Sequence, residues 1–147
     1  MEKCLFNVGS YGWGNLKCDN NNFPFSYLTD VPLEMLEEID GYLNTKMSMS
    51  ILLDGEGFFN TLVVNQYRVY VISEKNTEEL IKLNVSPENF IKQVVSDVKK
   101  QLVNIYQWNE SEEDAEEYGE IDEFNKRKEK INELIKKIEE RIIEMKW

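Results

Sequence analysis

The chain of 147 residues contains no histidine and only two cysteines. Histidine is the usual general base, triad member and metal ligand near neutral pH, so its absence removes the commonest catalytic centres. Cys4 and Cys18 would lack the imidazole partner that activates a nucleophilic thiol, and two thiolates with carboxylates make a poor zinc site. The sequence therefore predicts a protein that is not an enzyme and that holds no metal and no cofactor.

Long apolar runs are missing as well. No segment approaches the roughly 18 apolar residues of a membrane span, and the charged N-terminus lacks the apolar run of a signal peptide. We therefore expect a cytoplasmic protein without a membrane partner. In a reducing cytoplasm Cys4 and Cys18 are expected as free thiols, and a disulfide between them is the alternative.

Basic side chains are missing from one stretch in particular. The net charge is −11, and segment 110–123 carries nine carboxylates and no basic residue. Phosphate neutralisation by Lys and Arg dominates nucleic-acid binding, so we expect no nucleic-acid partner. A basic protein partner suits this charge. The candidate partner-binding carboxylates are Glu110, Glu112, Glu113, Asp114, Glu116, Glu117 and Glu120.

β-branched and aromatic runs predict a sheet at the centre of the chain. Residues 47–73 (MSMSILLDGEGFFNTLVVNQYRVYVIS) form an expected antiparallel meander with DGEG and NQ turns. Its second and third strands are apolar on both faces, which is typical of a sheet covered on both sides, and a partner could provide one cover. Asn60 and Thr61 would need hydrogen-bond partners if buried. The three expected strands are 47–53, 58–64 and 67–73.

A short strand at 4–9 is expected to precede a glycine- and asparagine-rich loop at 10–22. The glycines of this loop do not fit a phosphate-binding pattern, so it is interpreted as a turn-rich connection. Tyr11 and Trp13 lie in it, and they are a candidate anchor for a partner because aromatic residues are enriched in interface hot spots. Segment 23–28 contains a proline, which favours an edge strand or an extended segment.

The helices 31–43 and 87–108 each begin at a side-chain cap followed by a proline, and each carries an apolar stripe at helical spacing. A short helical turn is expected at 78–83. Like charges and Gly119 predict that 110–123 is a mobile loop, or helix ends that flank a short loop.

The last predicted helix, 121–147, repeats apolar residues alternately four and three positions apart. We expect it to pack on the preceding helix as a helical hairpin. The alternatives are a homodimer through the heptad seam and capture of a partner by the seam. The seam residues are Ile131, Ile135, Ile138 and Ile142. The sequence as a whole predicts one α+β domain, 1–147, with a sheet-and-helix body at 1–109, an acidic loop at 110–123 and a C-terminal amphipathic helix.

The acidic α+β composition, the LLDGEGFFN…VYVIS meander and the Lys/Glu/Asn/Ile usage loosely resemble, in type, the immunity proteins that bacteria encode beside polymorphic or contact-delivered toxins. The resemblance implies a protein that neutralises a basic toxin or effector enzyme by occlusion, with carboxylates meeting basic groups in its cleft. The alternative is a phage- or plasmid-encoded inhibitor or assembly factor that oligomerises through the C-terminal helix. Mimicry of nucleic acid by the carboxylates is a third hypothesis, and their concentration in one run counts against it.

Overall fold

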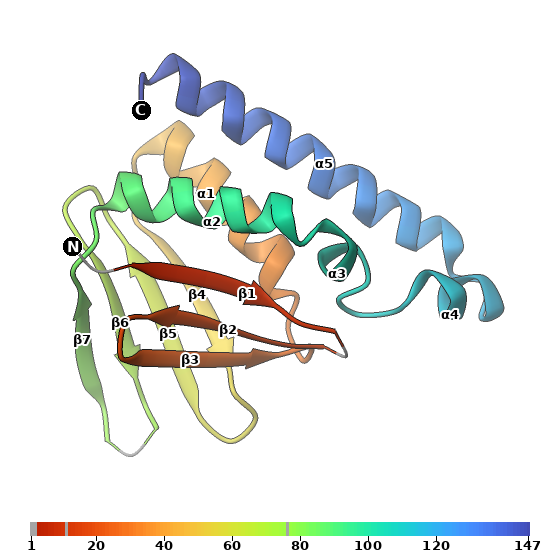
Figure 1. The fold of residues 1–147 in the computed structure, drawn as a ribbon, viewed down its shortest axis with the longest axis horizontal. Coiled ribbons are helices and arrows are strands. Elements are labelled where there is room, and N and C mark those ends of the chain that lie inside the picture. Colours follow the sequence, from red (N-terminus) through yellow and green to blue (C-terminus); the bar gives the residue numbers. More distant parts are fainter. Residues whose placement is uncertain (1–2, 11, 76) are drawn as a thin grey trace.

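Two antiparallel sheets occupy the first part of the chain. The computed structural model describes residues 3–10, 12–75 and 77–147. The first sheet has the order β1 (Cys4–Val8), β2 (Trp13–Cys18), β3 (Asn21–Ser26). The second has the order β4 (Met49–Asp54), β5 (Phe59–Val64), β6 (Val69–Ser73), β7 (Glu79–Leu83). The strands of one sheet run across those of the other (Figure 1). The α+β prediction is confirmed, and the predicted meander is β4–β6.

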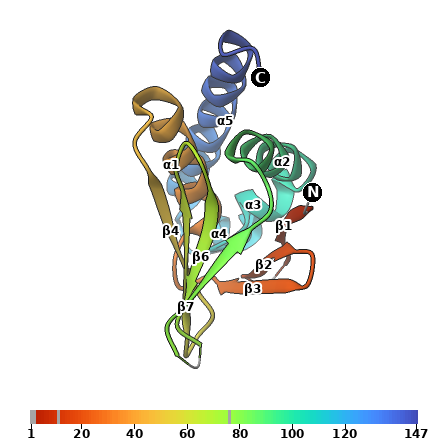
Figure 2. The same ribbon diagram turned by 90° about the vertical axis from the view of Figure 1, so that its left-hand side faces the viewer.

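Five helices complete the described chain: α1 (Val31–Thr45), α2 (Pro87–Lys100), α3 (Leu102–Tyr106), α4 (Glu112–Glu117) and α5 (Ile121–Glu144). The predicted caps are present, because Asp30 accepts a hydrogen bond from the Leu33 amide and Ser86 accepts one from the Asn89 amide. In Figure 2, α1 lies along β4 and α2 lies above β1. None of these helices combines the length and the apolar content that a membrane span requires.

Aromatic packing links the first sheet to the segment that follows α3. Phe25 stacks on Phe6 with ring centroids 5.4 Å apart, and its centroid lies 5.5 Å from that of Trp108. The Trp108 indole is buried, and its N–H donates to the carbonyl oxygen of Thr29 at 3.0 Å. Burial of so large a side chain contributes several kcal/mol of hydrophobic free energy, roughly 3 kcal/mol by transfer. Trp108 therefore fixes the point from which the acidic segment departs.

The predicted loop at 10–22 is wrong, since it contains all of β2 and the start of β3. Leu16 and Cys18 are buried and alternate with outward-facing Asn15 and Lys17, which is the period of a half-buried strand. The expectation of free thiols is also wrong. Cys4 lies directly opposite Cys18 in the β1–β2 register with a Cα–Cα distance of 4.1 Å, and the two form a disulfide.

Three further local predictions need correction. The expected helical turn at 78–83 is strand β7, because Leu83 and Ile81 continue the inner face of the sheet and pair with Val69 and Val71 of β6. The expected single helix at 87–108 is interrupted at Gln101, which separates α2 from α3. The acidic segment is not simply a loop, since it contains α4 with short connections on both sides.

The predicted C-terminal helix is confirmed as α5, but its main neighbour is α1 rather than the helix before it. Contacts with α3 and α4 are fewer, at the end where α5 begins (Figure 1). Three predicted seam residues, Ile131, Ile135 and Ile138, are 0%, 7% and 0% exposed, while Ile142 is half-buried. Because the chain's own core covers these three side chains, they do not face a second copy, and this corrects the predicted seam.

Side chains from α2 and α3 cover the outer edge of β1. The Asp97 carboxylate accepts a hydrogen bond from the Phe6 amide at 2.9 Å, and Gln101 accepts one from the Val8 amide at 2.8 Å. Gln101 donates to the Phe6 carbonyl at 2.7 Å, and Asn104 donates to the Val8 carbonyl at 2.9 Å. These side chains take the place of a neighbouring strand and satisfy backbone groups that an edge strand leaves free.

Candidate functional site

The acidic segment is an ordered projection at one end of the molecule. Figure 1 shows α4 at the end farthest from β7, below the start of α5. Ser111 begins α4 by accepting a hydrogen bond from the Asp114 amide at 3.1 Å, and Gly119, with φ +72°, turns the chain into α5. Glu110 is half-buried, and the remaining predicted carboxylates are exposed. The structure therefore brings the predicted acidic residues together on one surface.

None of the nine carboxylates of 110–123 forms an ion pair with any part of the chain that the structure describes. Several acids elsewhere are paired, for example Glu37 with Lys130 at 3.6 Å and Glu139 with Lys99 at 2.8 Å. The charge of the acidic segment is thus left without internal compensation.

Arg127 is the basic residue that lines a hollow of about 300 Å³ together with Glu110, Glu120 and Glu123, so it could neutralise part of this charge. Its guanidinium nevertheless binds Asp30 in a bidentate manner, with Nε–Oδ2 and Nη2–Oδ1 distances of 2.8 and 2.9 Å. Its Nη1 also donates to the carbonyl oxygens that end α3. The cation therefore anchors α5 to the start of α1 and leaves the neighbouring glutamates unpaired.

Partial burial and crowding of like charge both change the acidity of Glu110. Partial burial raises the pKa of this carboxyl above its ordinary value, and the neighbouring charge of Glu120 raises the pKa further. A hydrogen bond with the Glu120 side chain and the charges of Asp114 and Glu123 act in the same direction. A cation placed here would relieve this repulsion and favour the ionised form of Glu110.

A pocket of about 550 Å³ lies beside these carboxylates. The β1–β2 turn and the residue that follows β3 form one wall, and the segment from α3 to α4 forms the other. Glu110 and Asp114 supply negative charge, Asn104 and Gln107 supply amides, and Tyr27, 53% exposed, supplies an aromatic ring. Such a set suits the side chain of a lysine or an arginine, which combines a positive charge with an apolar stem.

The predicted aromatic anchor is only partly described. Trp13 is 42% exposed at the start of β2, and Gly12 beside it lines the pocket with Glu110. Tyr11 lies outside the described residues. The turn that carries Trp13 and the acidic segment thus share one end of the fold, although Trp13 does not itself line the pocket.

A second exposed surface is the outer face of the four-stranded sheet. Leu52, Thr61, Ile72 and Leu80 lie in register across its strands, and Leu52 and Leu80 are 40% and 54% exposed. This agrees with the two-faced apolar pattern of the sequence. The row carries no charge that would select a basic partner.

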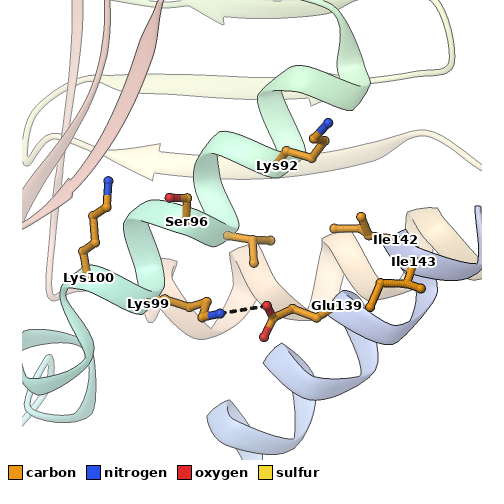
Figure 3. A pocket seen from close by; sticks show the side chains of 8 residues that line it. Lys92, Ser96, Lys99, Lys100, Glu139, Ile142 and Ile143 are labelled. Atoms are coloured by element: carbon orange, nitrogen blue, oxygen red, sulfur yellow. Dashed lines mark hydrogen bonds and ion pairs between the residues drawn. The ribbon is translucent and has the colours of Figure 1, made fainter. Parts of the chain in front are cut away.

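A groove of about 460 Å³ separates α2 from the last part of α5 (Figure 3). Lys92, Lys99 and Lys100 stand around it, while Ile142 and Ile143 form its apolar side on α5. Lys99 is paired across the groove with Glu139, and Lys92 with Glu88, 3.8 Å away on α2. Its cations are thus largely compensated, unlike the carboxylates of the acidic segment.

Sequence reasoning missed Asp30, Arg127 and Tyr27 as parts of this region. A signal for Arg127 was present, because it lies three residues after Phe124 and four before Ile131, on the apolar stripe of the helix. An arginine on such a stripe indicates a partly buried ion pair. Its partner is 97 positions away, so local sequence could not identify it.

Comparison of the chain with protein-family models, with curated proteins and with solved structures found no match. The function is therefore argued from the chemistry of the acidic surface. Within the described ranges, no group of three or more acidic or cysteine side chains is arranged to hold a metal ion. What the surface offers is a concentration of exposed negative charge next to a pocket that suits a basic side chain.

Proposed function

We propose that this chain is an acidic binding protein, without catalysis of its own, that neutralises a basic protein by covering its active cleft, as immunity proteins neutralise bacterial toxins. The observation that carries this proposal is the set of nine carboxylates on and beside α4, unpaired within the described chain. Such a field attracts and orients a basic partner, accelerates its association and weakens with salt.

The pocket beside α4 adds a specific contact to this general attraction. A lysine or arginine of the partner enters it, with its charge near Glu110 and Asp114 and its apolar stem along Tyr27. Occupation of the pocket by a cation lowers the raised pKa of Glu110, so binding is expected to release a proton and to strengthen as pH rises through that pKa.

The test is capture of a partner from a lysate of the native host, using the purified protein on a column. The decisive variant changes Glu112, Glu113, Glu116 and Glu117 to Gln. The matched control changes the exposed Glu129, Glu133, Glu140 and Glu144 of α5 to Gln, which removes the same charge elsewhere. We expect a basic protein to be retained by the wild type and by the control, and at least tenfold less by the α4 variant, a loss of about 1.4 kcal/mol or more.

Neutralisation is measured next, by co-expressing the captured protein with each variant and recording growth and the activity of the captured protein. Protection by the wild type and the control but not by the α4 variant supports the proposal. Equal capture by the wild type, the α4 variant and the control would show that the acidic surface does not contribute to binding. A captured protein whose activity is unaffected would refute neutralisation. A gene for a toxin domain directly upstream would be independent support.

A further inference from the structure

Asn60, the polar residue that interrupts the second meander strand in the sequence, is buried on the inner face of β5. It is 2% exposed, and its side-chain oxygen has no hydrogen-bond partner in the part of the chain that the structure describes. Ser73 lies opposite on β6 and is 9% exposed. Buried polar groups are nearly always bonded, so this polar pair in an otherwise apolar sheet face needs a physical explanation.

A pocket of about 310 Å³ lies over this pair. Its walls come from the β2–β3 turn and β3 on one side and from β5, β6 and β7 on the other. Its volume is at the lower end of the range of small-molecule sites, about 300 to 1,000 Å³. Its uncharged polar and aromatic lining includes Asn20, Asn21, Asn22, Phe58, Asn60 and Ser73.

The lining groups define the chemistry of a ligand. Each asparagine carboxamide can both donate and accept hydrogen bonds, and so can the Ser73 hydroxyl. Lys75 and Glu79 also line the pocket, and their opposite charges leave it without net charge. Phe58 supplies an aromatic ring, with Lys75 Nζ 5.2 Å from its centroid. The pocket therefore favours a neutral molecule with many groups that both donate and accept, together with an apolar face.

A sugar ring has this combination, because its hydroxyl groups donate and accept while its C–H faces pack on aromatic side chains. We propose that the pocket over Asn60 and Ser73 is a binding site for a neutral sugar. Asn60 and Asn21 bind its hydroxyl groups, and Phe58 contacts its ring. The terminal torsion of asparagine is soft, so a small rotation turns the Asn60 carboxamide toward the bound molecule. This site is separate from the acidic surface and does not depend on the function proposed for it.

The experiment is an NMR titration of the ¹⁵N-labelled full chain with three probes: glucose, galactose and N-acetylglucosamine. Each is added to about 20 mM, which detects dissociation constants near 1 mM. We expect at least one probe to shift the side-chain amide signals of Asn60 and Asn21. The Asn60→Leu variant, which has a similar size but no hydrogen-bonding group, is expected to bind at least tenfold more weakly.

The controls keep folding and binding separate. Asn60→Leu removes a buried carboxamide whose oxygen has no partner among the described residues, so its melting temperature is expected to equal or exceed that of the wild type. If it does not fold, Asn21→Ala at the pocket rim provides the same binding test. Asn125→Leu, on the exposed surface of α5, is the matched control and should bind like the wild type. Absence of shifts with all three sugars, or undiminished binding by the pocket variant, would overturn the proposal. A parallel titration uses the charged sugars glucuronate and glucosamine, and tighter binding of either one than of the neutral sugars would also overturn it.

Discussion

Replacement of Arg127 by Met tests the anchor that holds the acidic segment in place. The guanidinium makes two hydrogen bonds to Asp30, at 2.8 and 2.9 Å, and two to the carbonyl oxygens of Ile105 and Tyr106, at 2.6 and 3.0 Å. Methionine keeps much of the side-chain volume but none of the donors. The variant therefore leaves a carboxylate without its cation and two carbonyls without their donors, at the junction of α1, α3 and α5.

The expected loss follows from the burial of the pair. The Arg127 and Asp30 side chains are 15% and 21% exposed, and removal of one partner from a buried pair costs about 3–5 kcal/mol. Asp30 keeps the Leu33 amide as a donor and some contact with water, so we take the lower end, about 3 kcal/mol. At about 2–4 °C per kcal/mol for a chain of this size, the melting temperature should fall by about 6–12 °C.

Urea unfolding, followed by circular dichroism and tryptophan fluorescence, measures this loss. Arg141→Met is the matched control, because Arg141 pairs with Glu144 on the same helix, with side chains 38% and 64% exposed, and donates only one long hydrogen bond, of 3.4 Å, to the Leu43 carbonyl. An exposed pair contributes about 1 kcal/mol or less. Arg127→Lys keeps the positive charge but not the planar guanidinium with its several donors. Its loss of stability should lie between those of Arg127→Met and Arg141→Met. If Arg127→Met and Arg141→Met lose equal stability, the reasoning about the anchor is refuted.

Three further changes have defined outcomes. Glu110 has a raised pKa in the folded chain, so the stability that its protonated form contributes is lost as pH rises through that pKa. Gln resembles the protonated form, so Glu110→Gln should melt at a higher temperature than the wild type at neutral pH. In thermal scans this difference in melting temperature should shrink toward about pH 4. In Asp97→Asn the new side-chain NH2 group faces a hydrogen-bond donor, either the Phe6 backbone amide or the Gln93 side-chain amide. The free energy of unfolding, measured with urea, should therefore fall by about 2 kcal/mol. Reduction of the disulfide, whose cysteines are 14 positions apart, should cost about 3 kcal/mol, measured by melting with and without reductant.

Each of these three predictions has a control and a contrary result. Glu133→Gln removes an exposed acid paired with Lys137, and a pH profile identical to that of Glu110→Gln would exclude crowding as the cause. Asp40→Asn changes an acid that is only half-buried, and a loss of stability as large as that of Asp97→Asn would show that the deeper burial of Asp97 does not matter. The Cys4→Ser, Cys18→Ser double variant should melt like the reduced protein, and insensitivity of the wild type to reductant would contradict a stabilising disulfide.

Much of the fold was predictable because its signals are local. Helix caps with a following proline, apolar stripes and period-two alternation identify α1, the start of α2 and the strands β4–β6. β2 and β7 were missed because their outward positions carry Asn, Lys and Glu, residues that are common in loops and helices. Their strand conformation depends on pairing with β1 and β6, which composition does not reveal.

The candidate site was likewise predictable only in part. The carboxylates of 110–123 are visible in the sequence, and so is their excess over bases. Their lack of partners is not visible in the sequence, because it depends on the pairing of Arg127 with Asp30, which is 97 positions away. The heptad repeat of α5 likewise indicates an apolar face but not the surface that covers it, which proved to be α1 within the same chain. Periodicity identifies faces, whereas tertiary structure assigns their partners.

The side chains that cover the edge of β1 determine when this strand becomes protected during synthesis. The bonds from Asp97, Gln101 and Asn104 to β1 span 91 to 96 positions of the chain. During synthesis β1 therefore has an open edge until residues 97–104 have been made. Contacts of such long sequence separation form slowly, and an open edge is a template for pairing with other chains. Early chain release before Asn104 would leave the N-terminal sheet prone to aggregation.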